Sequence, residues 1–123
     1  MRFPSGFAIF IGACMLAQWT WFLFSGSVPE LHSEPVRLGF HLAAETLTAL
    51  LLIVAGGAGL GSKRWARPLL LVSLGMLLYT VIVSPGYFAQ RGQVGFVVMF
   101  AVIFALACVA IRAVVRSSLE TKE

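Results

Sequence analysis

Four long apolar segments, separated by short polar connections, make up most of the chain. They cover residues 7–24, 38–60, 69–87 and 94–111. A helix that crosses the hydrocarbon core of a bilayer needs about 17–25 predominantly apolar residues, so each segment is long enough to span a membrane. Short connections favour antiparallel neighbours in a bundle. The pattern therefore predicts an all-α integral membrane protein that folds as a four-helix up-down-up-down bundle.

The composition leaves little material for a region outside the membrane. The chain has 123 residues, of which 59% are hydrophobic and 11% are charged, and its mean hydropathy is +0.94. A soluble domain carries about a quarter charged residues, so this chain has too few to cover a water-facing surface. We therefore expect a single four-span domain over residues 1–123, which excludes a separate soluble catalytic module such as a Rossmann or P-loop domain.

The basic residues predict the orientation of the spans. An even number of crossings places most of them on one side of the membrane, namely Arg2, Lys63, Arg64, Arg67, Arg112, Arg116 and Lys122. The opposite side receives Arg37 and Arg91. Because Lys and Arg near the ends of spans are retained in the cytoplasm, both termini are predicted to be cytoplasmic and the protein to lie in the cell membrane. The net charge of +4 is thus interpreted as a topology signal, and no nucleic-acid partner is expected.

The first segment also has a second interpretation. Arg2, the apolar stretch and the small residues Ser25, Gly26 and Ser27 are arranged as in a secretory signal peptide with its cleavage site. The apolar stretch is longer than the roughly 7–15 residues usual for such signals. A permanent span is therefore the favoured interpretation of residues 7–24.

Several polar residues lie inside the spans at similar depth. Glu45 is seven residues inside the second segment, about 10 Å below its outer end at a rise of about 1.5 Å per residue. His41 and Thr48 lie on the same helical face as Glu45. Gln18 in the first segment and Thr80 in the third fall in the same layer. Since a charge in the bilayer core costs about 2.5–3.5 kcal/mol on insertion scales, Glu45 is expected to face the protein interior.

This layer predicts a polar cavity in the outer half of the bundle. Its walls would contain Gln18, His41, Glu45, Thr48, Tyr79, Thr80 and Ser84, and its aromatic rim would contain Trp19, Trp21 and Tyr87. The fourth segment has no strongly polar side chain and is expected to seal the bundle or to face lipid. The alternative is that the neutral polar residues only hydrogen-bond neighbouring helices, as they do in many membrane proteins.

Proline followed by glycine, at Pro85 and Gly86, is expected to end the third span and force a turn. That turn would direct Tyr87, Gln90 and Arg91 toward the outer mouth of the cavity.

The candidate chemistry centres on His41 and Glu45, which could share one proton. Such a pair suits a cationic or hydroxylated amphiphile, a quinone head or a proton. No metal or cofactor is predicted, because a closed metal site needs three or four ligands and the chain has only two histidines. Cys14 and Cys108 do not form a Cys-x-x-Cys pair, so thiol relay chemistry is not expected either.

The stretch AAETLTALLLIVAGGAGLGSKRWARPLLLVSLGMLLYT, Ala43 to Thr80, resembles the corresponding part of DoxX-like four-helix membrane proteins. The likeness consists of an early Glu, a leucine-rich middle, a glycine-containing helix end and a short basic link. The first segment departs from that family, with Gln18, Trp19 and Trp21 in place of its usual arginine, glycines and lysine. The resemblance implies a small bacterial or archaeal membrane protein, in some cases associated with oxidoreductases, and it carries over only Glu45.

Three functional hypotheses follow. The leading one is a membrane protein, more readily non-catalytic than an enzyme, whose outer cavity binds a small amphiphile or supports proton-linked passage. The second is an accessory subunit of a larger membrane complex such as an oxidoreductase. Self-association into a homo-oligomer is a separate expectation, and a protein that migrates alone as a monomer or homodimer would count against the second hypothesis. The third is an enzyme that uses His41 and Glu45 as an acid/base pair on a lipid or a quinone, although no nucleophile stands beside a base in the sequence.

Overall fold

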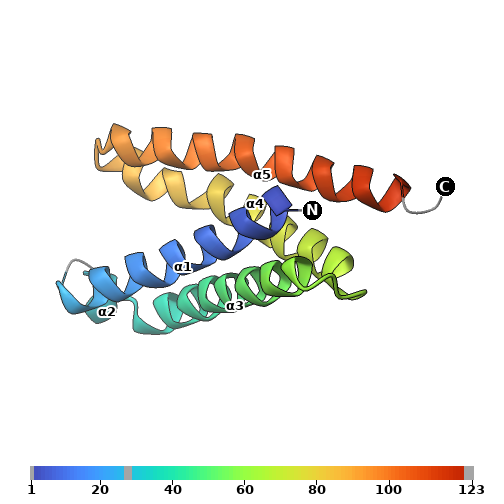
Figure 1. The fold of residues 1–123 in the computed structure, drawn as a ribbon. Coiled ribbons are helices and arrows are strands. Elements are labelled where there is room, and N and C mark those ends of the chain that lie inside the picture. Colours follow the sequence, from blue (N-terminus) through green and yellow to red (C-terminus); the bar gives the residue numbers. More distant parts are fainter. Residues whose placement is uncertain (1, 27–28, 121–123) are drawn as a thin grey trace.

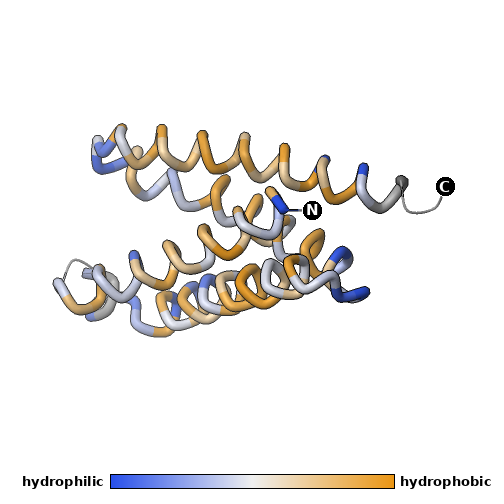
Figure 2. The backbone as a smooth tube through the Cα atoms, viewed as in Figure 1, coloured by the Kyte–Doolittle hydropathy of each residue, from blue (hydrophilic) through white to orange (hydrophobic). Residues whose placement is uncertain are grey.

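The computed structural model describes residues 2–26 and 29–120, and the regular secondary structure over those residues is all helical. Four helices are long and apolar enough to cross a membrane, and Figure 2 shows their apolar middles between more hydrophilic ends. This confirms the prediction of an all-α protein with four such helices. In chain order, the helices are α1 (Arg2–Phe24), the short α2 (Glu30–Ser33), α3 (Pro35–Leu60), α4 (Ala66–Gln90) and α5 (Val94–Glu120).

The long helices are arranged as two pairs. α1 lies along α3, and α4 lies along α5, whereas α1 contacts α4 and α5 only sparsely. The two pairs diverge toward the end that carries α2 and the α4–α5 connection, as Figure 1 shows. The two ends of the chain and the α3–α4 connection lie toward the opposite end. The bundle is therefore more open at the α2 end.

Small residues bring α1 and α3 into close contact. A Cβ atom added at Gly12 would lie 2.6 Å from the Ala49 carbonyl oxygen, and one added at Gly56 would lie 2.5 Å from the Ser5 carbonyl oxygen. Both separations are too short for real carbon–oxygen contacts, so only glycine permits this spacing. Close approach over small side chains is a usual way for membrane helices to associate, because lipid is as apolar as a leucine side chain.

The best-buried large side chains lie between the polar layer and the α3–α4 end of the bundle. Leu52 of α3 packs with Leu70, Leu74 and Leu77 of α4, each with at most 1% of its surface exposed. These leucines belong to α3 and α4, one helix from each pair. Their packing therefore holds the two pairs together at this end of the bundle. The polar and aromatic residues of α4 that follow Leu77 lie toward the more open end.

The α4 helix does not end where the sequence predicts. It continues through Pro85 and Gly86 as far as Gln90, and the turn is made after it, where Gly92 has a φ of 75°. The predicted turn at Pro85 is therefore wrong. A proline removes only one backbone donor from a helix, and membrane helices tolerate this loss because neighbouring helices and local adjustments satisfy the freed carbonyl.

Candidate functional site

A cavity of about 750 Å³ lies between the two helix pairs in the open half of the bundle. All four long helices contribute to its lining. Polar and charged side chains gather on one part of the wall, and apolar side chains form the rest. The apolar part includes Ile11, Met15, Leu77, Val81, Phe100 and Ile103. A cavity of this size and mixed character is of the kind that holds a small molecule in proteins.

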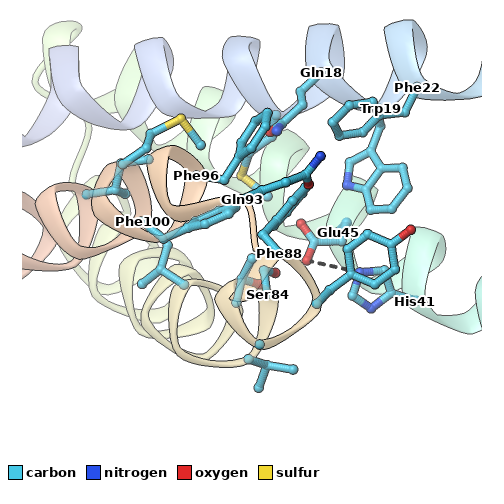
Figure 3. Close-up of a pocket in the computed structure, with 18 of the residues that line it drawn as sticks. Gln18, Trp19, Phe22, His41, Glu45, Ser84, Phe88, Gln93, Phe96 and Phe100 are labelled. Atoms are coloured by element: carbon cyan, nitrogen blue, oxygen red, sulfur yellow. Dashed lines mark ion pairs between the residues drawn. The ribbon is translucent and has the colours of Figure 1, made fainter. Parts of the chain in front are cut away.

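Glu45 of α3 projects into this cavity. Its exposed fraction is 6%, and its Oε1 atom lies 3.6 Å from Nε2 of His41, one helical turn earlier. The His41 side chain is more open, at 42% exposure. Figure 3 shows Trp19 and His41 near the Glu45 carboxylate, with the dashed line joining His41 and Glu45. A protonated His41 would form an ion pair with Glu45, and a neutral His41 remains a polar neighbour.

Two further helices supply donors to the same carboxylate. The side chains of Trp19 on α1 and Thr80 on α4 lie near the Glu45 carboxylate and carry groups that can donate to it. The Trp19 ring also packs edge-on against the His41 ring, with 5.5 Å between the ring centroids. Because a buried carboxylate without partners would be strongly unfavourable, these donors explain how the fold accommodates Glu45. Residues from three helices thus meet at one side chain.

Aromatic rings form the wall beside the carboxylate. Phe88 stacks on Phe96 with 4.5 Å between the ring centroids and lies 5.8 Å from Phe100 and 6.4 Å from Phe22. Tyr87 packs edge-on against the same Phe88 ring at 5.3 Å. The cluster joins α1, α4 and α5, so it holds together the part of the bundle in which the helix pairs diverge.

Two arginines lie at the mouth of the cavity, and each has a partner. Arg37 lies 3.5 Å from Glu34, measured between Nη1 and Oε2, with both side chains largely open to the surroundings. The guanidinium carbon of Arg91 lies 4.4 Å from the centre of the Tyr87 ring, a cation–π contact. Among the described residues, the entrance therefore carries two arginines and one acid, Glu34, whereas a second acid, Glu45, lies deeper.

The structure brings together most of the residues that the sequence places at this site. The cavity lining includes Gln18, Trp19, His41, Glu45, Thr80, Ser84 and Tyr87. Gln90, the last residue of α4, and Arg91, which follows it, also line the cavity near its mouth. The helix brings them there without the turn that was predicted at Pro85.

Three of the predicted lining residues lie elsewhere. Tyr79 and Trp21 are 71% and 70% exposed on the outside of the bundle, because each residue along a helix rotates the side chain by about 100°. Thr80 and Trp19 face inward. Tyr79, one residue before Thr80, and Trp21, two residues after Trp19, are therefore rotated to the outside. Thr48 is buried, and its hydroxyl donates to the Ala44 carbonyl of its own helix at 2.8 Å. Thr48 and Tyr79 are therefore not part of the cavity wall, and Trp21 is not part of its rim, contrary to the prediction from the sequence.

The sequence interpretation missed the contribution of α5. Phe96, Met99, Phe100 and Ile103 of this helix line the cavity, whereas the sequence suggested only a sealing or lipid-facing helix. The available signal was their spacing of three and four residues, which places them on one helical face. In a uniformly apolar segment that spacing does not stand out, because lipid-facing residues are equally hydrophobic.

Metal ligation has no candidate group in the described part of the chain. Over residues 2–26 and 29–120, His, Cys, Asp and Glu side chains do not gather in groups of three or more. The arrangement offers a carboxylate, an imidazole and amide groups to a polar head, and an apolar wall to an attached hydrocarbon.

A comparison with protein families matches the whole chain, residues 1–123, to a family described as "Domain of unknown function (DUF8058)". The chain belongs to this family. No curated protein and no solved structure matches the DUF8058 chain. These findings do not connect it with the DoxX-like proteins, and that resemblance stays a prediction. What the DUF8058 chain does must therefore be argued from the geometry of its cavity.

Proposed function

We propose that this protein is a multi-pass membrane protein that binds a small amphiphile in its cavity. The observation that carries the proposal is the position of Glu45, a nearly buried carboxylate in the wall of a cavity that is otherwise largely aromatic and aliphatic. Ionisable groups inside membrane helices are rare, and they commonly mark functional sites. A ligand with a polar head and a hydrocarbon body would complement both parts of this lining.

Binding fits the cavity better than passage through the bundle does. Beyond the apolar end of the cavity, Leu52, Leu70 and Leu74 fill the space between α3 and α4 with at most 1% exposure. A proton or an ion crossing the membrane would need polar groups or water along its route, and these leucines offer neither. The cavity is accordingly interpreted as a binding site that is closed at one end.

The proposal includes an orientation. The mouth of the cavity lies at the α2 end, with Arg37 and Arg91. The more numerous basic residues, including Lys63, Arg64 and Arg67 at the α3–α4 connection, lie toward the other end. The preference of Lys and Arg for the cytoplasmic side then places the helix bundle up-down-up-down, with the cavity in the outer half of the cell membrane and both chain ends in the cytoplasm.

The two cysteines of the chain provide a direct test of binding. Cys14 lines the cavity, whereas Cys108 of α5 lies outside it, and both are exposed. The protein is reconstituted in phosphatidylcholine nanodiscs and treated with the membrane-permeant thiol reagent N-ethylmaleimide. Decylamine, decanol and decyl sulfate serve as amphiphiles of equal chain length, and mass spectrometry measures the labelling rate of each cysteine.

At least one of these amphiphiles should slow the labelling of Cys14 in a saturable manner and leave the labelling of Cys108 unchanged. Cys108 serves as the internal control, since a general effect of the amphiphile on the bilayer would change both rates. Labelling of Cys14 that none of the three compounds slows, or that changes only in parallel with Cys108, would contradict the proposed function.

A further inference from the structure

Building on the proposed function, we infer the chemical class of the ligand: an amphiphile whose head is a protonated amine, held by Glu45. Of the two acids among the described residues that line the cavity, Glu45 is buried deep inside it, whereas Glu34 lies at the mouth beside Arg37. Arg91 also lies at the mouth. Three features favour a cationic nitrogen over a neutral or an anionic head. They are the position of the buried acid, the acceptor capacity left on it and the aromatic rings around it.

The first argument concerns charge. Among the residues that the structure describes, Glu45 is the charged residue that is buried, with 6% of its surface exposed. The lining arginines are held at the entrance by other partners, Arg37 beside Glu34 at 3.5 Å and Arg91 over the Tyr87 ring at 4.4 Å. A head group that enters as far as Glu45 therefore meets an acid with no arginine beside it, and a cation gains most from that contact.

The second argument concerns hydrogen bonding. An ionised carboxylate accepts through two oxygens that offer about four acceptor positions. Trp19 and Thr80 lie near Glu45 with groups that can donate to it, and His41 lies 3.6 Å away. These neighbours fix the orientation of the carboxylate and leave acceptor capacity on the side that faces the cavity. A primary ammonium group brings donors only, so it can use that capacity, whereas a sulfate or a carboxylate head brings acceptors only.

The third argument concerns the aromatic wall. Ring faces carry negative electrostatic potential, so they attract cations, and the attraction grows where water is excluded. Trp19 and Phe88 flank the Glu45 carboxylate in the cavity, as Figure 3 shows. The carboxylate and these aromatic rings thus lie on the same part of the wall. The methylene groups of an alkyl amine would continue along Phe100 and Ile103 toward the apolar end.

The ranking of three ligands by the wild-type protein tests this inference without any variant. In the Cys14 protection assay, decylamine should protect at a concentration at least about tenfold lower than decanol or decyl sulfate, because hydrogen bonds between charged groups are markedly stronger than those between neutral groups. Protection by decanol or decyl sulfate at equal or lower concentration would overturn the assignment of an amine head while leaving the proposed function intact. Failure of all three compounds would overturn both.

Two variants test whether the preference for decylamine over decanol depends on Glu45. Glu45→Gln keeps the size of the side chain and removes its charge, so the advantage of decylamine over decanol should fall by about tenfold or more. Glu34→Gln removes an acid from the exposed rim of the same cavity and should change that advantage by less than about twofold, because exposed charges interact weakly. An unchanged preference in Glu45→Gln, or an equal loss in both variants, would overturn the role of Glu45.

Discussion

At the scale of single residues, the proposed binding site depends on how the fold accommodates one acid. Glu45 is predictable from the sequence as an interior residue, because a carboxylate facing lipid would be costly. Its partners are less predictable. Thr80 could be inferred from depth alone, but Trp19 was expected only at the rim, and Tyr79 was expected beside Thr80 in the wall. Depth follows from counting residues, whereas the direction of a side chain depends on the rotation of each helix about its axis, which apolar surroundings do not reveal.

A matched pair of threonine variants tests the support of Glu45. Thr80→Val removes a hydroxyl that lies near the buried carboxylate and can donate to it, and it should lower the free energy of unfolding by about 1–3 kcal/mol. Thr48→Val removes a hydroxyl that donates only to the Ala44 carbonyl of its own helix and should cost less than about 1 kcal/mol, since such bonds contribute little to helix stability. Reversible unfolding in mixed micelles of dodecyl maltoside and sodium dodecyl sulfate measures both values. Equal losses would show that Glu45 does not depend on Thr80.

At the scale of helices, the sequence predicts the number and approximate position of the spans but not how the helices pair. The four apolar segments are confirmed as parts of α1, α3, α4 and α5. Each helix extends beyond its apolar segment, and α4 passes through Pro85, because the backbone can remain helical where hydrophobicity ends. The contact of α1 with α3 depends on which glycines face the partner helix, and the sequence contains more glycines than the contact uses.

Neighbouring glycines of α3 test that contact. An added Cβ at Gly56 would lie 2.5 Å from the Ser5 carbonyl oxygen, whereas one at Gly57 has no such neighbour within 4 Å. Gly56→Ala should therefore separate α1 from α3 and lower the melting temperature of the detergent-solubilised protein. Gly57→Ala should leave it unchanged or raise it, because alanine favours the helix over glycine by about 0.8–1.0 kcal/mol. Similar melting temperatures for both variants would contradict the close helix contact.

At the scale of the whole molecule, charge and cavity point to the same orientation. The mouth of the cavity lies at the end with fewer basic residues, and the α3–α4 connection carries Lys63, Arg64 and Arg67. The sequence could predict a polar layer on this side of the bundle. It could not predict a cavity, because a cavity exists only where the two helix pairs diverge, and α5 closes it with aromatic and aliphatic residues that resemble lipid-facing ones.

Cysteine labelling in intact cells checks the orientation. In a background with Cys14→Ser and Cys108→Ala, Ser33→Cys places a thiol at the α2 end, and Lys63→Cys places one at the α3–α4 connection. Both positions are exposed. A membrane-impermeant maleimide should label the Ser33→Cys protein in intact cells, and it should label the Lys63→Cys protein only after permeabilisation. The reverse pattern would place the cavity on the cytoplasmic side.

The central claim, that the cavity holds an amphiphile, is tested most directly by native mass spectrometry of the protein released from nanodiscs with bound decylamine. Ser84→Trp fills space inside the cavity, whereas Val102→Trp adds the same ring on the exposed face of α5, outside the lining. The wild type and Val102→Trp should each retain one bound decylamine, and Ser84→Trp should retain none. Equal retention by all three proteins would place the bound amphiphile outside the cavity and contradict the account.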